Sequence, residues 1–223
     1  MNIPSRKIVF ILIVPTSLFD YICLMNLKHD KELVIQKGVE LFRKEGYEAL
    51  GVNRICKATG MTKGAFYNAF ESKENFLLLC LSKYSEKGRK IISDLLARNM
   101  ELPAIQRLQN FYVDFLQLQT KVNYSGCLLN NTLSELGNGS TVIGKAADIH
   151  LETILTTIEP TVIEAQNEGD ITQQLASKKI VEILHLTLFG VLTQAKGKNE
   201  LQTGTEVIKS LFGLFNQQSF NNQ

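Results

Sequence analysis

Residues 51–74 read GVNRICKATGMTKGAFYNAFESKE, and this stretch decides the fold of the N-terminal part of the chain. Gly60 divides it into two short helical segments, of which the second runs from Lys63 to Phe70. Thr62 stands where a helix cap is needed, because its hydroxyl can accept a hydrogen bond from a backbone N–H two or three residues on. Both segments carry basic side chains, and neither contains Asp or Glu. This pattern predicts a helix-turn-helix that presents its second helix to a DNA groove.

Helices are also predicted on both sides of this stretch. Upstream, small and apolar residues recur at helical spacing before a helix-ending glycine, Gly46; they are Val34, Gly38, Leu41 and Phe42. Downstream, Ser72 caps a fourth, longer helix that the pattern extends to about Asn99. Phe66 and Phe70 are expected to be core residues that fix the third helix to the first. The fourth helix joins this three-helix unit to the rest of the chain, so motion at one end is expected to be felt at the other.

The apolar spacing stays helical in the remaining sequence, which contains no strand candidate and no internal repeat. Turn residues separate the helices, as at Asn123–Gly126 and Gly169-Asp170. One predicted helix begins at Pro103, and the next spans Cys127–Leu136. A third runs from a Ser140 cap to about Gln166, and the last two cover Gln173–Ala195 and Glu200–Phe215. The fold class is therefore expected to be all-α. Its parts are a helix-turn-helix unit at residues 28–74, a larger helical ligand-binding and dimerisation domain at 75–215, and a disordered tail at 216–223.

Composition sets limits on the function. The formal net charge of the 223 residues is only +2, so an argument for nucleic acid has to rest on local charge. The four cysteines form no CxxC pair and the three histidines have no metal-ligand spacing, so we expect no metal site, disulfide framework or cofactor. Free thiols are typical of a reducing cytoplasm. No nucleophile–base pairing and no glycine-rich phosphate loop is recognisable, which argues against an enzyme.

Residues 1–27 form an apolar N-terminal extension that differs from the rest of the chain. A basic start and an apolar run at Ile8–Val14 imitate a signal peptide, but Asp20 stands where small residues ought to form a cleavage site. Met25 opens a segment typical of a cytosolic start, so the residues before it are predicted to be an upstream extension of the reading frame or a dispensable arm. The alternative is a membrane-tethered helical sensor or binding protein anchored by residues 8–24, although a membrane helix needs roughly 20 apolar residues.

The N-terminal part resembles the TetR/AcrR family of bacterial repressors. The resemblance rests on VIQKGVELFRKEGYEA at residues 34–49, VNRICKATGMTKGAFYNAF at 52–70 and ESKENF at 71–76. It implies a homodimeric, cytoplasmic transcriptional regulator that binds a double-stranded DNA operator and is released from it, as a repressor, by a small molecule bound in the larger domain. Leu50-Gly51 departs from the family, since many members have there a Thr or Ser that caps the second helix and contacts a phosphate. That contact is not expected here.

The resemblance and the local chemistry together indicate the DNA-contacting residues. Tyr67 and Lys73 match the family's phosphate-contacting tyrosine and lysine. Thr62 and Lys63 stand at the start of the recognition helix, where a hydroxyl, an ammonium and free backbone N–H groups converge on an anion. The other candidates are Gly64 for close backbone approach, Asn68 for adenine or a phosphate, and Arg54 for the DNA backbone or guanine.

The larger domain is expected to bind a small apolar or electrophilic effector. Its aromatic residues and histidines supply the candidate lining residues, which are Phe111, Tyr112, Phe115, Tyr124, His150 and His185. His185 lies in the apolar stretch IVEILHLTLFG. It is predicted to be either a hydrogen-bonded core histidine or the polar anchor of a ligand.

Cys127 is a further candidate in the larger domain. The sequence GCLLNNTLSEL at Gly126–Leu136 resembles a subgroup of the family that includes electrophile-responsive repressors. At the start of a helix, the helix dipole lowers the pKa of a thiol and favours the thiolate, so Cys127 could report electrophiles or oxidants. The alternative is a small buried residue that serves only packing.

The last two helices are expected to form the dimer interface. Each carries an apolar stripe, and Gly190 permits close approach of a partner helix. The stripes consist of Ile180, Ile183, Leu184, Leu188, Val191 and Leu192 on one helix and Val207, Ile208, Leu211, Phe212 and Phe215 on the other. A dimer is also needed for function, because one recognition helix reads only a half-site and its partner must sit about one DNA turn away.

Overall fold

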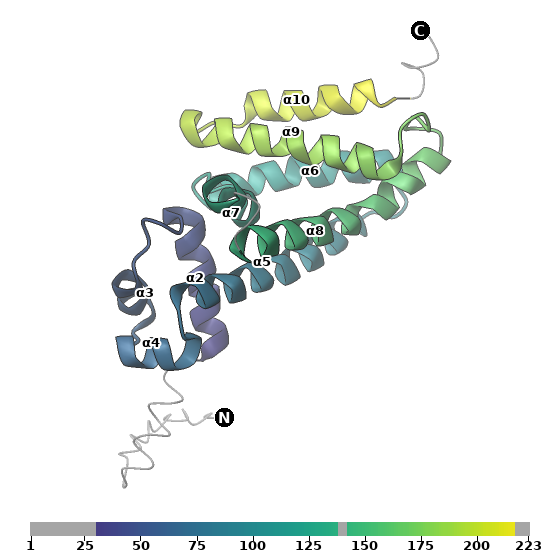
Figure 1. Cartoon of the computed structure of the whole chain (residues 1–223). Helices are drawn as coiled ribbons and strands as arrows, with labels where there is room; N and C mark the ends of the chain where they lie inside the picture. The colour runs from purple at the N-terminus through teal and green to yellow at the C-terminus, as the bar shows by residue number, and fades with distance from the viewer. Residues whose placement is uncertain (1–29, 138–141, 217–223) are drawn as a thin grey trace, which may run out of the picture.

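The computed structural model describes residues 30–137 and 142–216, and within these residues the chain is all-α, as predicted (Figure 1). A small unit at one end of the molecule consists of α2 (Lys31–Glu45), α3 (Val52–Thr59) and α4 (Lys63–Phe70). The larger domain consists of α5 (Lys73–Leu96), α6 (Ala104–Lys121), α7 (Leu128–Leu136), α8 (Val142–Asn167), α9 (Ser177–Lys198) and α10 (Gln202–Leu214). The predicted N-terminal extension, the Ser140 cap and the tail from residue 217 on lie outside the described residues.

Local sequence sets the helix ends of the small unit. α2 ends at Gly46, whose φ of 80° is a conformation that glycine adopts without strain. Gly60 ends α3 in the left-handed conformation, with a φ of 73°. The hydroxyl oxygen of Thr62 accepts a hydrogen bond of 3.2 Å from the backbone N–H of Ala65, which confirms the predicted cap of α4. α3, by contrast, begins after Gly51 and has no side-chain cap.

Phenylalanine rings form the core of the small unit. Phe66 and Phe70 are buried, as predicted, and their ring centroids lie 5.3 and 4.6 Å from that of Phe76 on α5. Phe42 of α2 contributes a fourth ring, 5.8 Å from Phe76. Phe70 also contacts the first helix directly, as predicted, because Nζ of Lys31 on α2 lies 5.5 Å from the centre of its ring. The ring that both Phe66 and Phe70 contact belongs to α5, and α2 joins the same cluster through Phe42.

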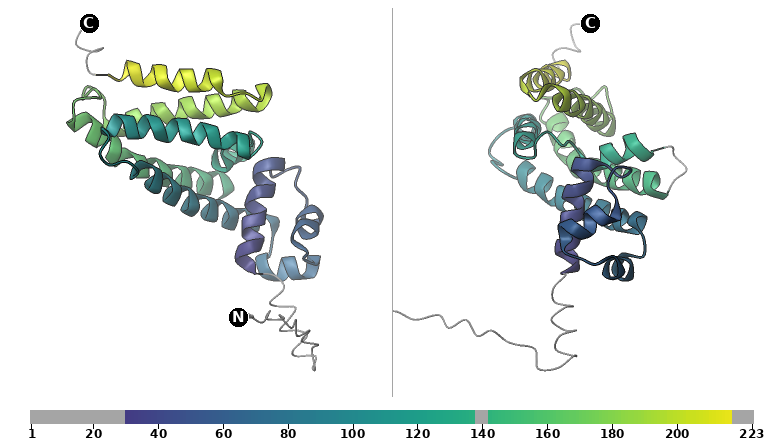
Figure 2. Two further views of the ribbon diagram at one scale, coloured as in Figure 1. Left: turned by 180° about the vertical axis from the view of Figure 1, so that it is seen from behind. Right: turned by 90° about the vertical axis from the view of Figure 1, so that its left-hand side faces the viewer.

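α5 joins the small unit to the larger domain. Its first part crosses α2 at close range, which Gly38 allows: a Cβ atom at Gly38 would lie 2.4 Å from Cζ of Phe76 and 2.7 Å from Sγ of Cys80. Its remainder runs beside α8 through the larger domain (Figures 1 and 2). One continuous helix thus packs against both parts of the molecule, as the sequence predicts.

α9 and α10 form an outer layer of the larger domain (Figure 2), in which α9 packs directly against α8 and α10 packs against α6. The two helices approach closely at Gly204, where a Cβ atom would lie 2.3 Å from Cγ1 of Val191.

The apolar stripes predicted for the dimer face pack mainly within this domain. Most of their members are buried in the single chain: Ile180, Leu184, Leu188, Val191, Leu192, Ile208, Phe212 and Phe215. A stripe in the sequence marks an apolar face without saying whether its partner lies in the same chain. The apolar residues that α9 and α10 leave exposed are Val207 (41% exposed), which belongs to a predicted stripe, and Leu186 (70%) and Leu214 (65%), which do not. Gly190 is exposed beside them, with no heavy atom within 4 Å of a Cβ built on it.

The start of α9 differs from the prediction by several residues. The pattern places it at Gln173, whereas the helix begins at Ser177. The side-chain amide of Gln166 explains the difference, because its Nε2 donates hydrogen bonds of 2.8 Å to the carbonyls of both Thr172 and Leu175. These bonds hold the connection in a non-helical path.

Two other helix ends also differ. α5 ends at Leu96 rather than near Asn99, which is itself left-handed with a φ of 53°. α9 continues through Gly197 to Lys198 and stops at Asn199, whose φ is 54°. Asparagine tolerates the left-handed conformation better than other residues with a side chain, so the helix ends at Asn199 rather than at the predicted Ala195.

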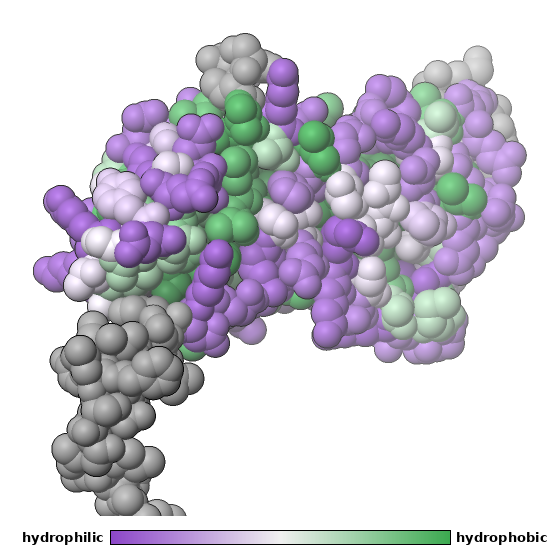
Figure 3. All heavy atoms as spheres, turned by 60° about the horizontal axis from the view of Figure 1, so that its bottom comes forward, coloured by the Kyte–Doolittle hydropathy of each residue, from purple (hydrophilic) through white to green (hydrophobic). Residues whose placement is uncertain are grey.

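Hydrophilic residues cover most of the face shown in Figure 3, with smaller hydrophobic areas between them. Among the helices that the structure describes, none combines the length and the apolar character that crossing a lipid bilayer requires.

Candidate nucleic-acid interface and ligand cavity

α4 buries one face and leaves the other open. Phe66 is fully buried, whereas the neighbouring Tyr67 is 47% exposed and touches the Phe66 ring edge-on at 5.5 Å. The predicted residues of this helix all lie exposed: Thr62, Lys63, Gly64, Tyr67 and Asn68. The fold therefore brings the α4 candidates together on one surface that carries an ammonium, two hydroxyls, an amide and no carboxylate.

The N-terminal turn of α4 has the features of an anion site. Thr62 uses its hydroxyl oxygen as a cap acceptor, and its O–H remains able to donate. The first backbone N–H groups of the helix are free to donate at this end, and the positive end of the helix dipole adds to the positive charge of Lys63. Gly64 has no heavy atom within 4 Å of a built Cβ, so the protein itself does not require glycine there. The open space suits close approach of another molecule.

Arg54 and Lys73 lie outside α4, and each already has a partner within the protein. Arg54 Nη2 lies 3.3 Å from Oε1 of Glu45, and about half of the Arg54 side chain is exposed. Lys73 donates a hydrogen bond of 2.9 Å to the carbonyl of Tyr47, and its Nζ also lies 3.9 Å from the centre of the Tyr47 ring. Lys73 therefore supports the turn between α2 and α3, and its contact with DNA stays a prediction.

The same turn is held by the larger domain. The carboxylate of Glu135 on α7 accepts hydrogen bonds from two consecutive backbone N–H groups, those of Tyr47 at 2.9 Å and Glu48 at 2.8 Å. The backbone of Tyr47 is thus held twice by the larger domain, at its N–H by Glu135 of α7 and at its carbonyl by Lys73 at the start of α5.

A cavity of about 470 Å³ lies where α2 meets the larger domain. It is bounded by α2, α5, α6, α8 and α9 and by Cys127 at the start of α7. Small-molecule sites commonly have about 300–1,000 Å³, so the size fits a small ligand. Apolar side chains from four helices supply much of the wall, among them Ile91, Phe115, Leu118, Leu151, Ile154 and Phe189.

Four of the predicted ligand-binding residues line this cavity, namely Phe111, Phe115, Cys127 and His185. Tyr112 is fully buried behind the wall. The other two are not brought to the cavity. Tyr124 lies in the turn after α6 with a φ of 53°, and His150 lies on α8, where its carbonyl accepts a bond from the Ser85 hydroxyl. Aromatic and histidine content alone could not separate lining residues from their neighbours.

His185 and Tyr112 form a buried polar pair in the apolar interior. The Tyr112 hydroxyl lies 3.0 Å from Nδ1 of His185. Burial lowers the pKa of His185 to about 4 and raises that of Tyr112, so both side chains are neutral near pH 7. The histidine is therefore a hydrogen-bonded core residue, which is the first predicted alternative. It also lines the cavity, and its role as the polar anchor of a ligand stays a prediction.

Cys127 directly precedes α7, where its side chain makes no capping hydrogen bond, and it is buried. Burial raises the pKa of its thiol, and this effect exceeds the lowering by the backbone N–H groups of Asn130 and Leu129, the Tyr84 hydroxyl and the charge of Arg43. The expected stabilisation of the thiolate by the helix start is present but smaller than the desolvation cost. At neutral pH the group is a thiol, which corrects the expectation of a thiolate.

Sequence reasoning missed the polar residues of the cavity. Arg43, Tyr84, Gln119 and the lysines at its margin belong to helix faces that show no special pattern in a single sequence. Only the packing of α2 against the larger domain brings them together. Among the described residues, no group of three or more His, Cys, Asp or Glu side chains is arranged to hold a metal ion.

Comparison with known proteins gives the family. Residues 34–80 match the bacterial regulatory proteins of the tetR family, and residues 104–211 match the tetracyclin repressor-like C-terminal domain. The HTH-type transcriptional repressor DhaR of Mycobacterium sp. (strain GP1) is 28% identical over 166 residues, which is 74% of this chain and 82% of that protein. The transcriptional regulator AcuR of Cereibacter sphaeroides is 26% identical over 164 residues, or 73% and 74% of the two chains.

Among solved structures, the regulatory protein TetR from Rhodobacter sphaeroides has a TM-score of 0.75 at 23% identity and covers 84% of this chain and 98% of its own. At this identity the likeness shows the fold alone. The exposed helix-turn-helix and the matched C-terminal domain together define a two-domain transcriptional regulator. The chain belongs to the TetR family, in agreement with the resemblance found at residues 34–76.

Proposed function

We propose that this protein is a homodimeric transcriptional repressor that leaves its operator when a small molecule occupies the cavity. The observation that carries the proposal is the position of α2. This helix packs against α5, with which it supports α4, and it also supplies a wall of the cavity. The relative DhaR is a repressor, which supports repression over activation. We assign no catalytic activity, and the cytoplasm is the compartment in which the proposed DNA target lies.

The DNA contacts are proposed for the exposed surface of α4. Lys63 and the hydroxyls of Thr62 and Tyr67 bind phosphates, which position the helix, and Asn68 reads a base edge or a further phosphate. Gly64 lets the backbone approach the DNA. The same surface offers no carboxylate that would repel it. Arg54 and Lys73 join this surface only if DNA competes with their partners Glu45 and Tyr47.

Release is proposed as a population shift between two arrangements of the small units in the dimer. A ligand in the cavity contacts α2 and α5 together, so it favours the arrangement whose cavity fits it best. Release follows if that arrangement no longer spaces the recognition helices by one DNA turn. The ligand has to bind the released arrangement more tightly, because equal affinity for both would shift nothing.

The dimer is proposed to form through the outward faces of α9 and α10. Leu186, Val207 and Leu214 are exposed there, and Gly190 leaves room for a partner helix. Two helices from each subunit can pack as a four-helix arrangement. This face replaces the predicted stripes, most of which the single chain buries.

An electrophilic effector is a second candidate, because Cys127 lines the cavity. A compound bound there would lie beside the thiol and could react with it. The raised pKa of Cys127 means that such a reaction depends on the bound compound's proximity more than on a standing thiolate.

Selection of bound DNA from a random pool, followed by sequencing, tests the proposed function. We expect enrichment of an inverted repeat whose half-sites are about one helical turn apart, or a multiple of it. A Lys63→Ala, Tyr67→Phe double variant should enrich nothing. Failure of the native protein to enrich any sequence at low salt would contradict DNA reading.

A further inference from the structure

The cavity has unequal charge at its margin. Its lining includes four basic side chains but a single acidic one, Glu40. Glu40 already pairs with Lys37 at 2.8 Å, and Lys83 already pairs with Glu32 and Glu86. Of the four basic side chains that line the cavity, Arg43, Lys87 and Lys121 form no ion pair with any described residue. Cavity and positive charge together select for a ligand that is both apolar and anionic.

Arg43 is the most specific of these groups. Its Nε atom is buried and has no hydrogen-bond partner among the described residues. A buried N–H of a charged group without an acceptor costs free energy, which a ligand oxygen would recover. The guanidinium is planar and can donate two parallel hydrogen bonds to a carboxylate, a geometry that a lysine ammonium lacks.

The surroundings of Arg43 suit the same ligand group. The charge of Arg43 acts on both Cys127 and Tyr84, which places these three side chains in one polar corner of the cavity. The phenol and the thiol are hydrogen-bonded to each other, so one of their two protons remains to be donated to a ligand, and both groups are neutral because burial raises their pKa values. The corner therefore offers donors and one fixed positive charge, with no competing anion.

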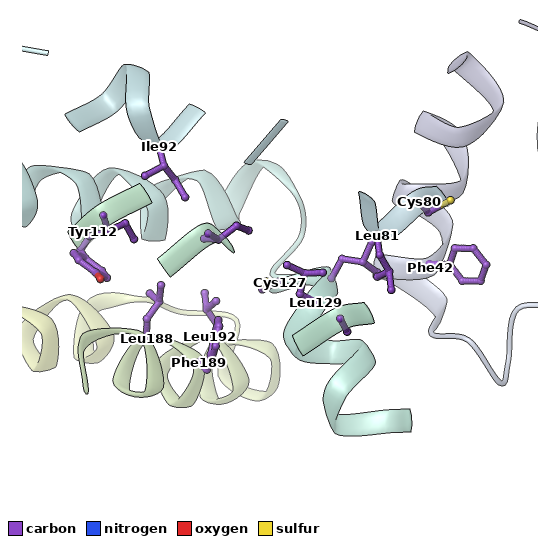
Figure 4. Close-up of a cluster of buried hydrophobic side chains, with 14 of the residues drawn as sticks. Phe42, Cys80, Leu81, Ile92, Tyr112, Cys127, Leu129, Leu188, Phe189 and Leu192 are labelled. Carbon is purple, nitrogen blue, oxygen red and sulfur yellow. The ribbon is translucent and has the colours of Figure 1, made fainter. Parts of the chain in front are cut away.

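The rest of the cavity suits an apolar body. In the view of Figure 4, Cys127 lies between Tyr112 and Phe42, so the polar corner is on the α2 side of the larger domain's core. On the opposite side His185, bonded to Tyr112, is kept neutral by burial. Between them lie apolar walls such as Ile92, Phe111 and Leu188. A charge at that far end would be costly.

We propose that the ligand is an amphiphilic carboxylate, with its head group on Arg43 and its apolar body directed towards His185. The proposal rests on the proposed function of the cavity as the effector site and names the class of the effector. Arg43 follows Phe42 on α2, and Phe42 belongs to the aromatic core of the small unit. A head group that bonds Arg43 therefore acts on the helix that supports the DNA-binding surface.

Isothermal titration of the purified full-length protein with three probes of equal chain length tests the ligand class. The probes are decanoate, decanol and decylamine, which differ only in the head group. We expect decanoate to bind about tenfold or more tightly than decanol, because hydrogen bonds to charged groups contribute about 1.5–3 kcal/mol. Decylamine should bind more weakly than both.

Variants locate the head group. Arg43→Gln should remove the preference for decanoate over decanol, Arg43→Lys should keep part of it, and Lys121→Gln should weaken decanoate by about threefold, as expected for an exposed charge. Lys90→Gln is the matched control, since Lys90 is an exposed lysine on α5 that does not line the cavity. Circular dichroism checks each fold, and the Arg43→Lys and Lys121→Gln titrations decide the matter if Arg43→Gln does not fold.

Decanol binding as tightly as decanoate, or an Arg43→Gln variant with unchanged preference, would overturn the ligand class. A separate titration measures the affinity for the selected operator with and without decanoate. If decanoate binds through Arg43 and the operator affinity stays unchanged, the ligand class stands and the effector role in the proposed function fails. DNA reading is tested independently by the selection experiment.

Discussion

Oε2 of Glu135, on α7, accepts a hydrogen bond of 2.9 Å from the backbone N–H of Tyr47, in the turn between α2 and α3. Oε1 of the same carboxylate accepts a second bond from the next residue, Glu48. The turn therefore depends on the larger domain for two of its backbone donors. Since this turn leads directly into the helix-turn-helix, a shift of α7 would be transmitted to α3 without passing through α5.

Glu135→Ala is expected to loosen this connection. The loss of two charge-assisted acceptors at an exposed site should lower the free energy of unfolding by about 1 kcal/mol. Hydrogen exchange at the amides of Tyr47 and Glu48 should become about tenfold faster, because their openings are local. Exchange measured by mass spectrometry or NMR checks this. Asp148→Ala is the control, since Asp148 is exposed on α8 and its carboxylate has no hydrogen bond or ion pair among the described residues. Unchanged exchange at both amides in Glu135→Ala would contradict the connection.

Lys63→Ala is expected to weaken operator binding at all sequences and to reduce the salt dependence. Each subunit of the dimer loses one phosphate contact, so the slope of log affinity against log salt should fall by about 0.9 per subunit, or about 1.8 for the dimer. Tyr67→Phe removes only a hydroxyl and should cost about 0.5–1.5 kcal/mol per subunit with little change of slope. Fluorescence anisotropy with labelled operator at several salt concentrations measures both. Lys209→Ala, an exposed lysine on α10, should leave affinity and slope unchanged.

The helix-turn-helix could be predicted from sequence because its signals are local. Gly46 and Thr62 act within one helical turn of their own positions, and Ser72 likewise accepts from Asn75 at 3.0 Å to begin α5. The cavity could not be predicted in the same way. Arg43 and His185 come from α2 and α9, and only tertiary packing brings them to the same cavity. The outward face of α9 was not predicted as an interface for a related reason, since the apolar stripe that the sequence shows on this helix packs inside the chain.

Acidification is expected to destabilise the protein through His185. Its pKa is about 4 in the folded protein and 6.5 when unperturbed. Between these values the unfolded chain binds a proton that the folded protein does not, so stability falls as pH drops from about 6.5 towards 4. At about pH 5 the loss should be roughly 2 kcal/mol relative to pH 7.5. Urea unfolding at the two pH values measures it.

A Tyr112→Phe, His185→Leu double variant is the control for this pH effect. It replaces both members of the pair, so that neither is left as an unpaired buried polar group. Most of the pH dependence should disappear, leaving the smaller contribution of His150, whose pKa burial also lowers. A double variant with the full pH dependence of the native protein would show that other groups cause it.

Cys127 is expected to react slowly with iodoacetamide in the native protein. Burial raises the pKa of its thiol, so the reactive thiolate is scarce near neutral pH and increases as pH rises. Cys127 should nevertheless react faster than Cys80, because it lines the cavity while Cys80 is fully buried between helices. Tyr84→Phe should slow it further, since the Tyr84 hydroxyl lowers the pKa of Cys127. Peptide mass spectrometry at timed intervals gives the rates. A Cys127 no more reactive than Cys80 ends the electrophile-sensor hypothesis.

Leu186→Glu and Leu214→Glu are expected to separate the dimer. Both side chains are mostly exposed in the single chain, so the substitutions should leave its fold intact. In a dimer through α9 and α10 they would bury unpaired carboxylates, which costs several kcal/mol and corresponds to a dimer weaker by about a hundredfold or more. Sedimentation analysis measures the association, and operator affinity should fall with it because a single recognition helix reads only a half-site. Leu33→Glu, at an equally exposed apolar residue on α2, should remain dimeric. A Leu186→Glu, Leu214→Glu variant that sediments as native dimer would place the interface elsewhere.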